Sequence, residues 1–277
     1  MNIIQLFSLL DLKRDEILKL DSEDYIRIEK KINFEKKINP EIDSRTSENL
    51  ILALKEYKEE LLFVLSNRIL FNFLNQSNFS KNNFSDYDLT VSDEKIKNFI
   101  SLFLADDLVS FFGLKLSKNK YNTLEELSDL LNFKGYFPEE ILHKMALLVF
   151  SKVDFVNSQL VSSENVNSNI YYIEFNPFYD LLSHFSGIEM DQKVANLLSV
   201  VFKFYKRNKN VLFFNSVLRS MASYTAFNEN LHELLIKNRE AVSKTGQGIE
   251  AEINHPAMGI ALAVICALIP FIVTKCS

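Results

Sequence analysis

Three of the four histidines follow a glutamate by three positions, in the pairs Glu140/His143, Glu229/His232 and Glu252/His255. On a helix, residues i and i+3 lie on one face, so each pair can direct two ligands toward one metal ion. Two such pairs, joined by bridging glutamates from two further helices, form the carboxylate di-metal sites of helical bundles. The spacing therefore indicates a candidate iron or manganese site with Glu140, His143, Glu229 and His232 as ligands.

The sequence does not assign the bridging glutamates that such a site needs. The pair Glu252/His255 directly precedes Pro256, and a residue before proline is driven away from helical geometry. The same spacing therefore occurs where no helix is expected, and exposed polar residues on helix surfaces are the simpler interpretation of the other two pairs. A helical metalloenzyme is kept as the alternative function.

The segment Ser85-Asp86-Tyr87-Asp88-Leu89-Thr90-Val91 resembles the Asp-x-Asp element of nucleotidyltransferases. The resemblance covers seven residues and implies two carboxylates that hold Mg²⁺ for phosphoryl transfer. The glycine turn that binds phosphate upstream in that family is replaced by Gln76-Ser77 and an Asn-rich stretch. A solvated loop is therefore the favoured interpretation of this segment.

Composition excludes several classes of protein. The 277 residues include 6 Gly and carry a net charge of −5. Neither the phosphate-binding loop nor the dinucleotide-binding glycine pattern occurs, and an acidic chain gives no electrostatic reason to expect nucleic acid as a partner. The only thiols, Cys266 and Cys276, lie in or beside one apolar segment, so the rest of the chain contains neither a disulfide framework nor a thiolate zinc site.

Apolar spacing near 3.6 residues predicts a mostly α, multi-helix bundle. Residues 1–10 read as an amphipathic first helix, and further helices are expected over residues 23–38, 48–75, 92–112, from Pro138 onward, and 228–243. Ser47, Ser92 and Asn228 are the expected N-caps, Thr123 and Glu126 form a predicted capping box, and Gly113 ends the helix before it. The β-branched and aromatic run at residues 170–175 predicts a short strand.

Composition also divides the chain. An N-terminal helical region covers residues 1–156, and a second region, residues 170–244, is expected to pack on it or to form one domain with it. The Ser/Asn-rich residues 157–169 between them read as a boundary or loop. Residues 245–256 are a predicted linker, and residues 257–274 a membrane helix.

The predicted membrane helix is the strongest functional signal. Residues 257–274 contain no charged side chain, and eighteen helical residues span about 27 Å, close to the 30 Å of a bilayer core. Gly259, Ala263 and Ala267 recur every four residues, which favours self-association of such helices. Basic residues are more numerous before this segment than after it, which places the N-terminal body in the cytoplasm.

These observations favour a non-enzymatic interaction or effector module that acts at a membrane as a single-pass, tail-anchored protein. Self-association through the tail, followed by perturbation of the bilayer, is an extension of that hypothesis. A soluble all-helical binding protein whose apolar C-terminal helix belongs to its core is the third interpretation. No cofactor is expected outside the metalloenzyme alternative, and the protein partner is not identified.

Overall fold

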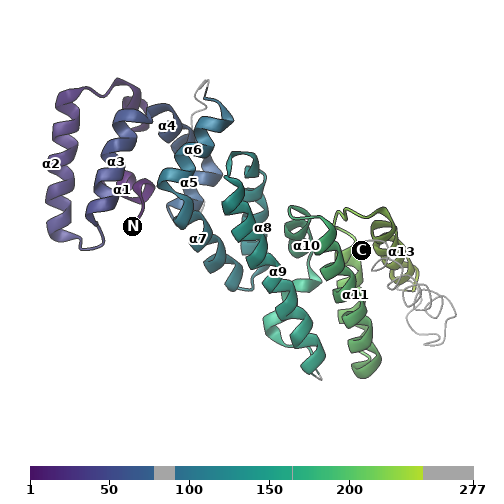
Figure 1. Ribbon diagram of the computed structural model, residues 1–277. Coiled ribbons are helices and arrows are strands. Elements are labelled where there is room, and N and C mark those ends of the chain that lie inside the picture. The colour runs from purple at the N-terminus through teal and green to yellow at the C-terminus, as the bar shows by residue number, and fades with distance from the viewer. Residues whose placement is uncertain (78–90, 164, 246–277) are drawn as a thin grey trace. The chain divides into compact units, whose positions relative to one another are not determined.

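A computed structural model describes residues 1–77, 91–163 and 165–245. Within these ranges the regular elements are the α-helices α1 to α13 and three 3-10 helices, η1 to η3, and no strand occurs among them (Figure 1). The prediction of a mostly α-helical protein is therefore confirmed.

The chain divides into two compact units, and each unit is formed by two separate stretches of the sequence. Unit 1 comprises the described residues of Met1–Leu114 together with Asn132–Met145. Unit 2 comprises Lys115–Leu131 and the described residues from Ala146 onward. Two helices, α7 (Ala105–Ser117) and α9 (Glu139–Ser162), each contribute residues to both units.

Unit 1 is built around α4 (Lys58–Ser66), whose Leu61, Leu62, Val64 and Leu65 are buried. Contacts join α4 to the helices on either side of it in sequence and to α6. The other elements of the unit, besides the parts of α7 and α9, are α1 (Ile3–Leu9), η1 (Arg14–Lys19), α2 (Ser22–Ile38), α3 (Ser44–Glu56), α5 (Arg68–Leu74), α6 (Asp93–Phe103) and η2 (Lys134–Tyr136). The expected first helix is confirmed, because α1 buries its apolar side chains against α3 and α5.

Unit 2 packs α8 (Tyr121–Leu131) against α10 (Asn176–Ser183) and α12 (Val211–Met221) against α13 (Glu229–Thr245). The 3-10 helix η3 (Ser168–Glu174) contacts both α10 and α12, and α11 (Ile188–Asn208) packs on α12. Aromatic rings fill much of this core, with Phe178 lying 5.2 Å from Tyr172 and 5.1 Å from Tyr179 between ring centroids.

Basic side chains satisfy carbonyl groups at several helix ends. Lys58 Nζ donates to Leu20 O at 2.9 Å, at the end of η1. Arg207 donates to Leu160 O at 2.6 Å and to Val161 O at 3.0 Å, in the last turn of α9. The last carbonyls of a helix have no partner within the helix, and cations there also complement the helix dipole. These contacts join the end of one element to the end of another.

Residues 48–75 form three helices, so the prediction of one long helix is wrong. The Asn67 side-chain oxygen accepts hydrogen bonds from the N–H groups of Ile69 and Leu70, and these bonds start α5. Asn competes with helical hydrogen bonding in this way and favours caps. The earlier break falls at Tyr57, whose ring packs edge-on against Phe103 with 5.3 Å between centroids.

The expected helix over residues 92–112 is also divided. It breaks at the buried Leu104 into α6 and α7, and Gly113 lies inside α7, not at a C-terminus. Ser92 occupies the N-cap position of α6 but makes no side-chain cap bond. Neither proline nor glycine marks this break, and tertiary packing therefore overrides the helical pattern of the sequence.

Two predicted caps lie inside helices. Asp43 caps α3 by accepting from Thr46 N at 2.6 Å, and the Ser47 hydroxyl donates to Asp43 O within the first turn. The helix α8 begins at Tyr121, and the Thr123 hydroxyl donates to Lys120 O at 2.7 Å, so Thr123 does not form the predicted capping box. In contrast, Asn228 caps α13 as predicted, by accepting from Leu231 N at 3.2 Å.

The predicted strand at residues 170–175 is instead the 3-10 helix η3. Its buried side chains are Ile170, Tyr172 and Ile173, a spacing that does not alternate as one face of a strand requires. The Asn167 side chain accepts from Asn169 N at 3.0 Å and starts the turn. Likewise α9 extends to Ser162, so residues 157–162 are helical and not the predicted loop.

Candidate functional site

The four proposed metal ligands lie at the beginnings of two helices. Glu140 and His143 are exposed in the first turns of α9, and Glu229 and His232 are exposed in the first turn of α13. Glu140 is paired with Lys144, one turn further along α9, at 2.6 Å. The hydrogen bond from Lys144 lowers the pKa of the Glu140 carboxyl.

The described residues supply neither Glu-x-x-His pair with further ligands. Among them, no three His, Cys, Asp or Glu side chains gather in a way that would hold a metal ion. The first pair belongs to unit 1 and the second to unit 2. Each pair alone offers two ligands on an exposed helix surface, so the metal site stays a prediction without support from the geometry.

Several other candidate residues lie outside the described ranges. These are Glu252 and His255, the two carboxylates of the Asp86/Asp88 segment, and the small-residue ladder Gly259, Ala263 and Ala267. None of the helices formed by the described residues combines the length and apolar character needed to cross a bilayer.

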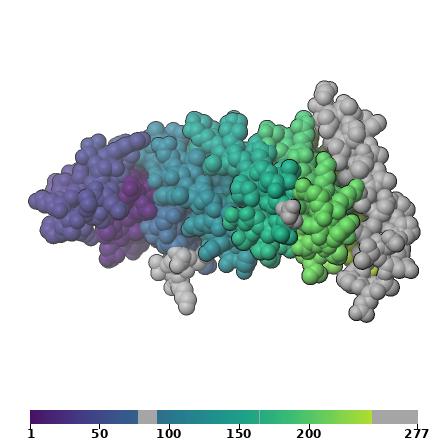
Figure 2. All heavy atoms as spheres, turned by 90° about the horizontal axis from the view of Figure 1, so that it is seen from below, coloured from purple at the N-terminus to yellow at the C-terminus, as the bar shows by residue number. Residues whose placement is uncertain are grey.

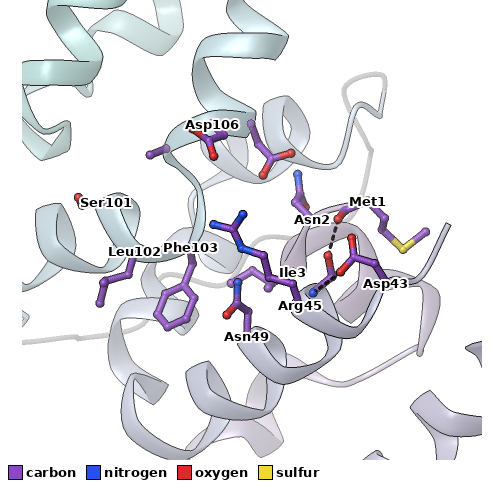
Figure 3. A pocket seen from close by; sticks show the side chains of 13 residues that line it. Met1, Asn2, Ile3, Asp43, Arg45, Asn49, Ser101, Leu102, Phe103 and Asp106 are labelled. Carbon is purple, nitrogen blue, oxygen red and sulfur yellow. Dashed lines mark hydrogen bonds between the residues drawn. The ribbon is translucent and has the colours of Figure 1, made fainter.

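A polar pocket of about 270 Å³ opens in unit 1, where α1, α3 and α7 begin and α6 ends (Figure 3). Its volume is at the low end for a small-molecule site. The lining residues are Met1, Asn2, Ile3, Asp43, Arg45, Thr46, Asn49, Ser101, Leu102, Phe103, Ala105, Asp106 and Asp107.

Much of the pocket wall consists of helix caps. The Asn2 side-chain oxygen accepts from Gln5 N at 2.9 Å, and its amide nitrogen donates to Leu74 O at 3.0 Å. The Thr46 hydroxyl donates to Met1 O at 2.8 Å, which joins α3 to the start of α1 (Figure 3). These polar groups are therefore used in holding helix ends together.

The pKa values of two carboxyl groups that line the pocket are shifted in opposite directions. Burial raises the pKa of the Asp107 carboxyl, whereas the amino group of Met1, the Asn2 side chain and Arg45 act in the opposite direction. The backbone N–H of Thr46 lowers the pKa of the Asp43 carboxyl. The Arg45 side chain extends into the pocket, on the side where Asp106 lies (Figure 3). This mixture of charges fits a junction of helix ends better than a reaction centre.

A serine and a histidine that sequence reasoning missed are hydrogen-bonded in unit 2. Ser128 Oγ of α8 lies 3.0 Å from His184 Nε2 at the C-cap of α10, and 56 positions separate the two residues. A hydroxyl beside an imidazole is one part of a nucleophilic site, which also needs a group that binds the developing oxyanion. The bond joins α8 and α10, which pack against each other.

Unit 2 also holds a half-buried lysine without a carboxylate partner among the described residues. Lys152 Nζ donates to Leu116 O at 2.8 Å and to the side chain of Asn119, and it lies 4.6 Å from the centre of the Tyr172 ring. Burial lowers the pKa of Lys152 to about 8. Leu116, whose carbonyl oxygen accepts from Lys152, lies in the last turn of α7. Lys152 therefore acts as a cation that binds the carbonyl end of a helix.

Comparison with known proteins identifies no relative: no family model, curated protein or solved structure matches the chain.

Proposed function

We propose that the protein is a non-enzymatic helical interaction or effector module that residues 257–274 attach to a membrane, with its helical body in the cytoplasm. One observation carries the proposal: these eighteen residues contain no charged side chain and would span about 27 Å as a helix. A helix on the surface of a soluble protein would show a polar face. The segment lies outside the described residues, so the proposal rests on sequence.

Self-association of the tail is the second part of the proposal. Gly259, Ala263 and Ala267 would form one small-residue face of such a helix, which permits close approach of two backbones. Association of residues 257–274 from several chains could recruit a partner or perturb the bilayer. Finding a monomer in detergent, together with no leakage from liposomes, would remove this part and leave the anchor.

The metalloenzyme alternative gains no favouring observation from the described residues. Its four ligands are exposed, and one of them, Glu140, already forms an ion pair with Lys144. We therefore propose no catalytic role for them.

Membrane fractionation with an alkaline wash tests the anchor, using the full chain and a variant truncated after residue 249. The proposal expects the full chain to stay with the membrane and the truncated chain to be soluble and folded. If the full chain is washed off and the truncated chain aggregates, the apolar segment belongs to the core and the protein is a soluble helical binding protein. Circular dichroism of the truncated chain separates loss of the anchor from loss of the fold.

A further inference from the structure

One corner of unit 2 concentrates positive charge in an otherwise acidic chain. Residues 192–228 contain six Lys or Arg residues and no Asp or Glu, whereas the whole chain carries a net charge of −5. Four of the six gather where α11 ends and α12 begins, at Lys203, Lys206, Arg207 and Lys209. Together with Leu212 they are named the basic corner.

Two lysines of this corner, Lys203 and Lys206, are available to an external anion. Lys203 and Lys206 are exposed and share one face of α11, three residues apart, and neither forms an ion pair within the described part of the chain. Arg207, on the same face, is held by its bonds to Leu160 O and Val161 O of α9. The ends of α9 and α11 consequently lie side by side at one edge of unit 2 (Figure 1).

An apolar side chain projects from the same corner. Leu212 is 78% exposed, the highest value for any large hydrophobic residue in the described ranges, and Val161 beside Arg207 is 58% exposed. The helix dipole explains why cations gather at the end of α11, but it does not explain an exposed leucine in the first turn of α12. The residues of α11 reach the face of unit 2 that Figure 2 presents to the viewer.

The backbone holds Leu212 outward in a fixed position. Lys209 has a φ of 58° and ends α11 in the left-handed conformation. Asn210 caps α12 by accepting from Phe213 N at 3.1 Å. The rings of Tyr205 and Phe214 stack across the corner with 4.3 Å between centroids. The corner therefore presents its leucine without a loop that must first be ordered.

We propose that the basic corner docks on an anionic lipid surface, with Leu212 inserted at the level of the headgroups. Lysine and arginine beside an anionic leaflet attract it, and an exposed apolar side chain gains free energy by leaving water for the acyl boundary. A nucleic acid would match the charge but would leave the leucine in water, which is why lipid is the partner that fits both features. The inference rests on the proposed membrane location, because a lipid surface is within reach only of a protein that resides there.

The chain contains no tryptophan, so Leu212→Trp in the full-length protein is a unique fluorescent reporter of the corner. The probes are vesicles of phosphatidylcholine alone and of phosphatidylcholine mixed with phosphatidylserine, with and without brominated acyl chains. We expect a blue shift and quenching by brominated lipid only when phosphatidylserine is present. The matched control is Phe227→Trp, at a position that is 69% exposed in the same unit, and its emission should not respond.

Charge reversal tests the basic residues. In the Leu212→Trp background, Lys203→Glu/Lys206→Glu should weaken the phosphatidylserine-dependent signal about thirtyfold or more, since each of the two lysines contributes about 1 kcal/mol near an anionic leaflet and about 1.4 kcal/mol corresponds to tenfold. The variant Lys30→Glu/Lys37→Glu makes the same change of net charge at exposed positions of α2. An equal loss in both variants would mean that bulk charge, not this corner, governs binding, and would overturn the proposal.

The experiment separates lipid contact of the basic corner from membrane attachment by residues 257–274. If the Leu212→Trp protein sediments with vesicles but its tryptophan emission does not change, the corner does not touch lipid and only the anchor stands. If the protein binds no vesicle, both proposals fall. A Leu212→Trp response to an oligonucleotide in place of vesicles would identify a nucleic-acid surface and overturn the lipid assignment.

Discussion

The Tyr224 hydroxyl donates a hydrogen bond of 2.6 Å to the carboxylate of Asp191, and both side chains are buried. The same carboxylate accepts from the backbone N–H groups of Phe227 at 3.2 Å and Asn228 at 2.7 Å. Asp191 lies in the first turn of α11. Its hydrogen bonds therefore join the start of α11 to the segment that connects α12 and α13. Three donors thus provide hydrogen bonds to the oxygens of this buried side chain.

Replacing Asp191 should therefore cost more than the loss of one hydrogen bond. Asp191→Ala leaves a buried hydroxyl and two backbone N–H groups without an acceptor, and we expect the free energy of unfolding to fall by about 3 kcal/mol or more. Tyr224→Phe removes one donor and should cost about 1 to 2 kcal/mol. Urea unfolding of the two single variants and the double variant measures the coupling. Additive losses would show that the two side chains act independently.

Tyr179 differs from Tyr224, because its buried hydroxyl lacks a hydrogen-bond acceptor among the described residues. Its ring is fully buried in α10, and its hydroxyl has no hydrogen-bond partner among the described residues. A buried hydroxyl without a partner carries the cost of leaving water and gains nothing in return. Tyr179→Phe should consequently leave the stability within about 0.5 kcal/mol of the wild type or raise it. A loss as large as that of Tyr224→Phe would contradict this view of the core.

Lys152 predicts a dependence of stability on alkaline pH. Burial lowers its pKa to about 8 in the folded protein, from an ordinary value of 10.5. Between these two pKa values the unfolded chain binds more protons at Lys152 than the folded chain does. The contribution of Lys152 to the free energy of unfolding therefore rises with pH across this window. We expect the stability of the wild type relative to Lys152→Met to increase from pH 8 to pH 10. Denaturant titrations of both proteins at matched pH give this difference, and a flat or falling difference would refute the prediction.

Metal analysis of the purified protein tests the alternative function. A carboxylate di-metal site holds two ions per chain, and we expect less than about 0.2 iron or manganese per chain. Glu140→Gln/His143→Gln should leave the melting temperature unchanged, because both side chains are exposed. Two bound ions that are lost in this variant would restore the metalloenzyme hypothesis.

The sequence carries the signals of local structure only in part. Of the expected N-caps, Asn228 forms its cap bond, whereas Ser47 lies inside α3 and Ser92 makes no cap bond. Asn2 and Asp21 cap α1 and α2, and these two caps were not predicted. Polar residues near a helix start are therefore visible in short stretches of sequence, but the residue that makes the cap bond is not. The exposed Glu-x-x-His spacing is visible in the same way, yet spacing does not tell whether a second pair lies nearby. A site that needs several helices depends on contacts between distant residues, and those contacts have no local signature.

By itself, the sequence determined that the protein is mostly α-helical, because apolar periodicity and caps are local properties of the chain. Only the tertiary structure decided that the long apolar runs break at Tyr57 and Leu104, because packing against other elements selects those breaks. The break at Asn67 differs, because the side chain of Asn67 caps α5 locally. The tertiary structure also decided that residues 168–174 form a 3-10 helix, and that Asp191 meets Tyr224 and Ser128 meets His184. Each of these pairs joins residues more than thirty positions apart, and only folding of the whole unit brings such residues within hydrogen-bonding distance.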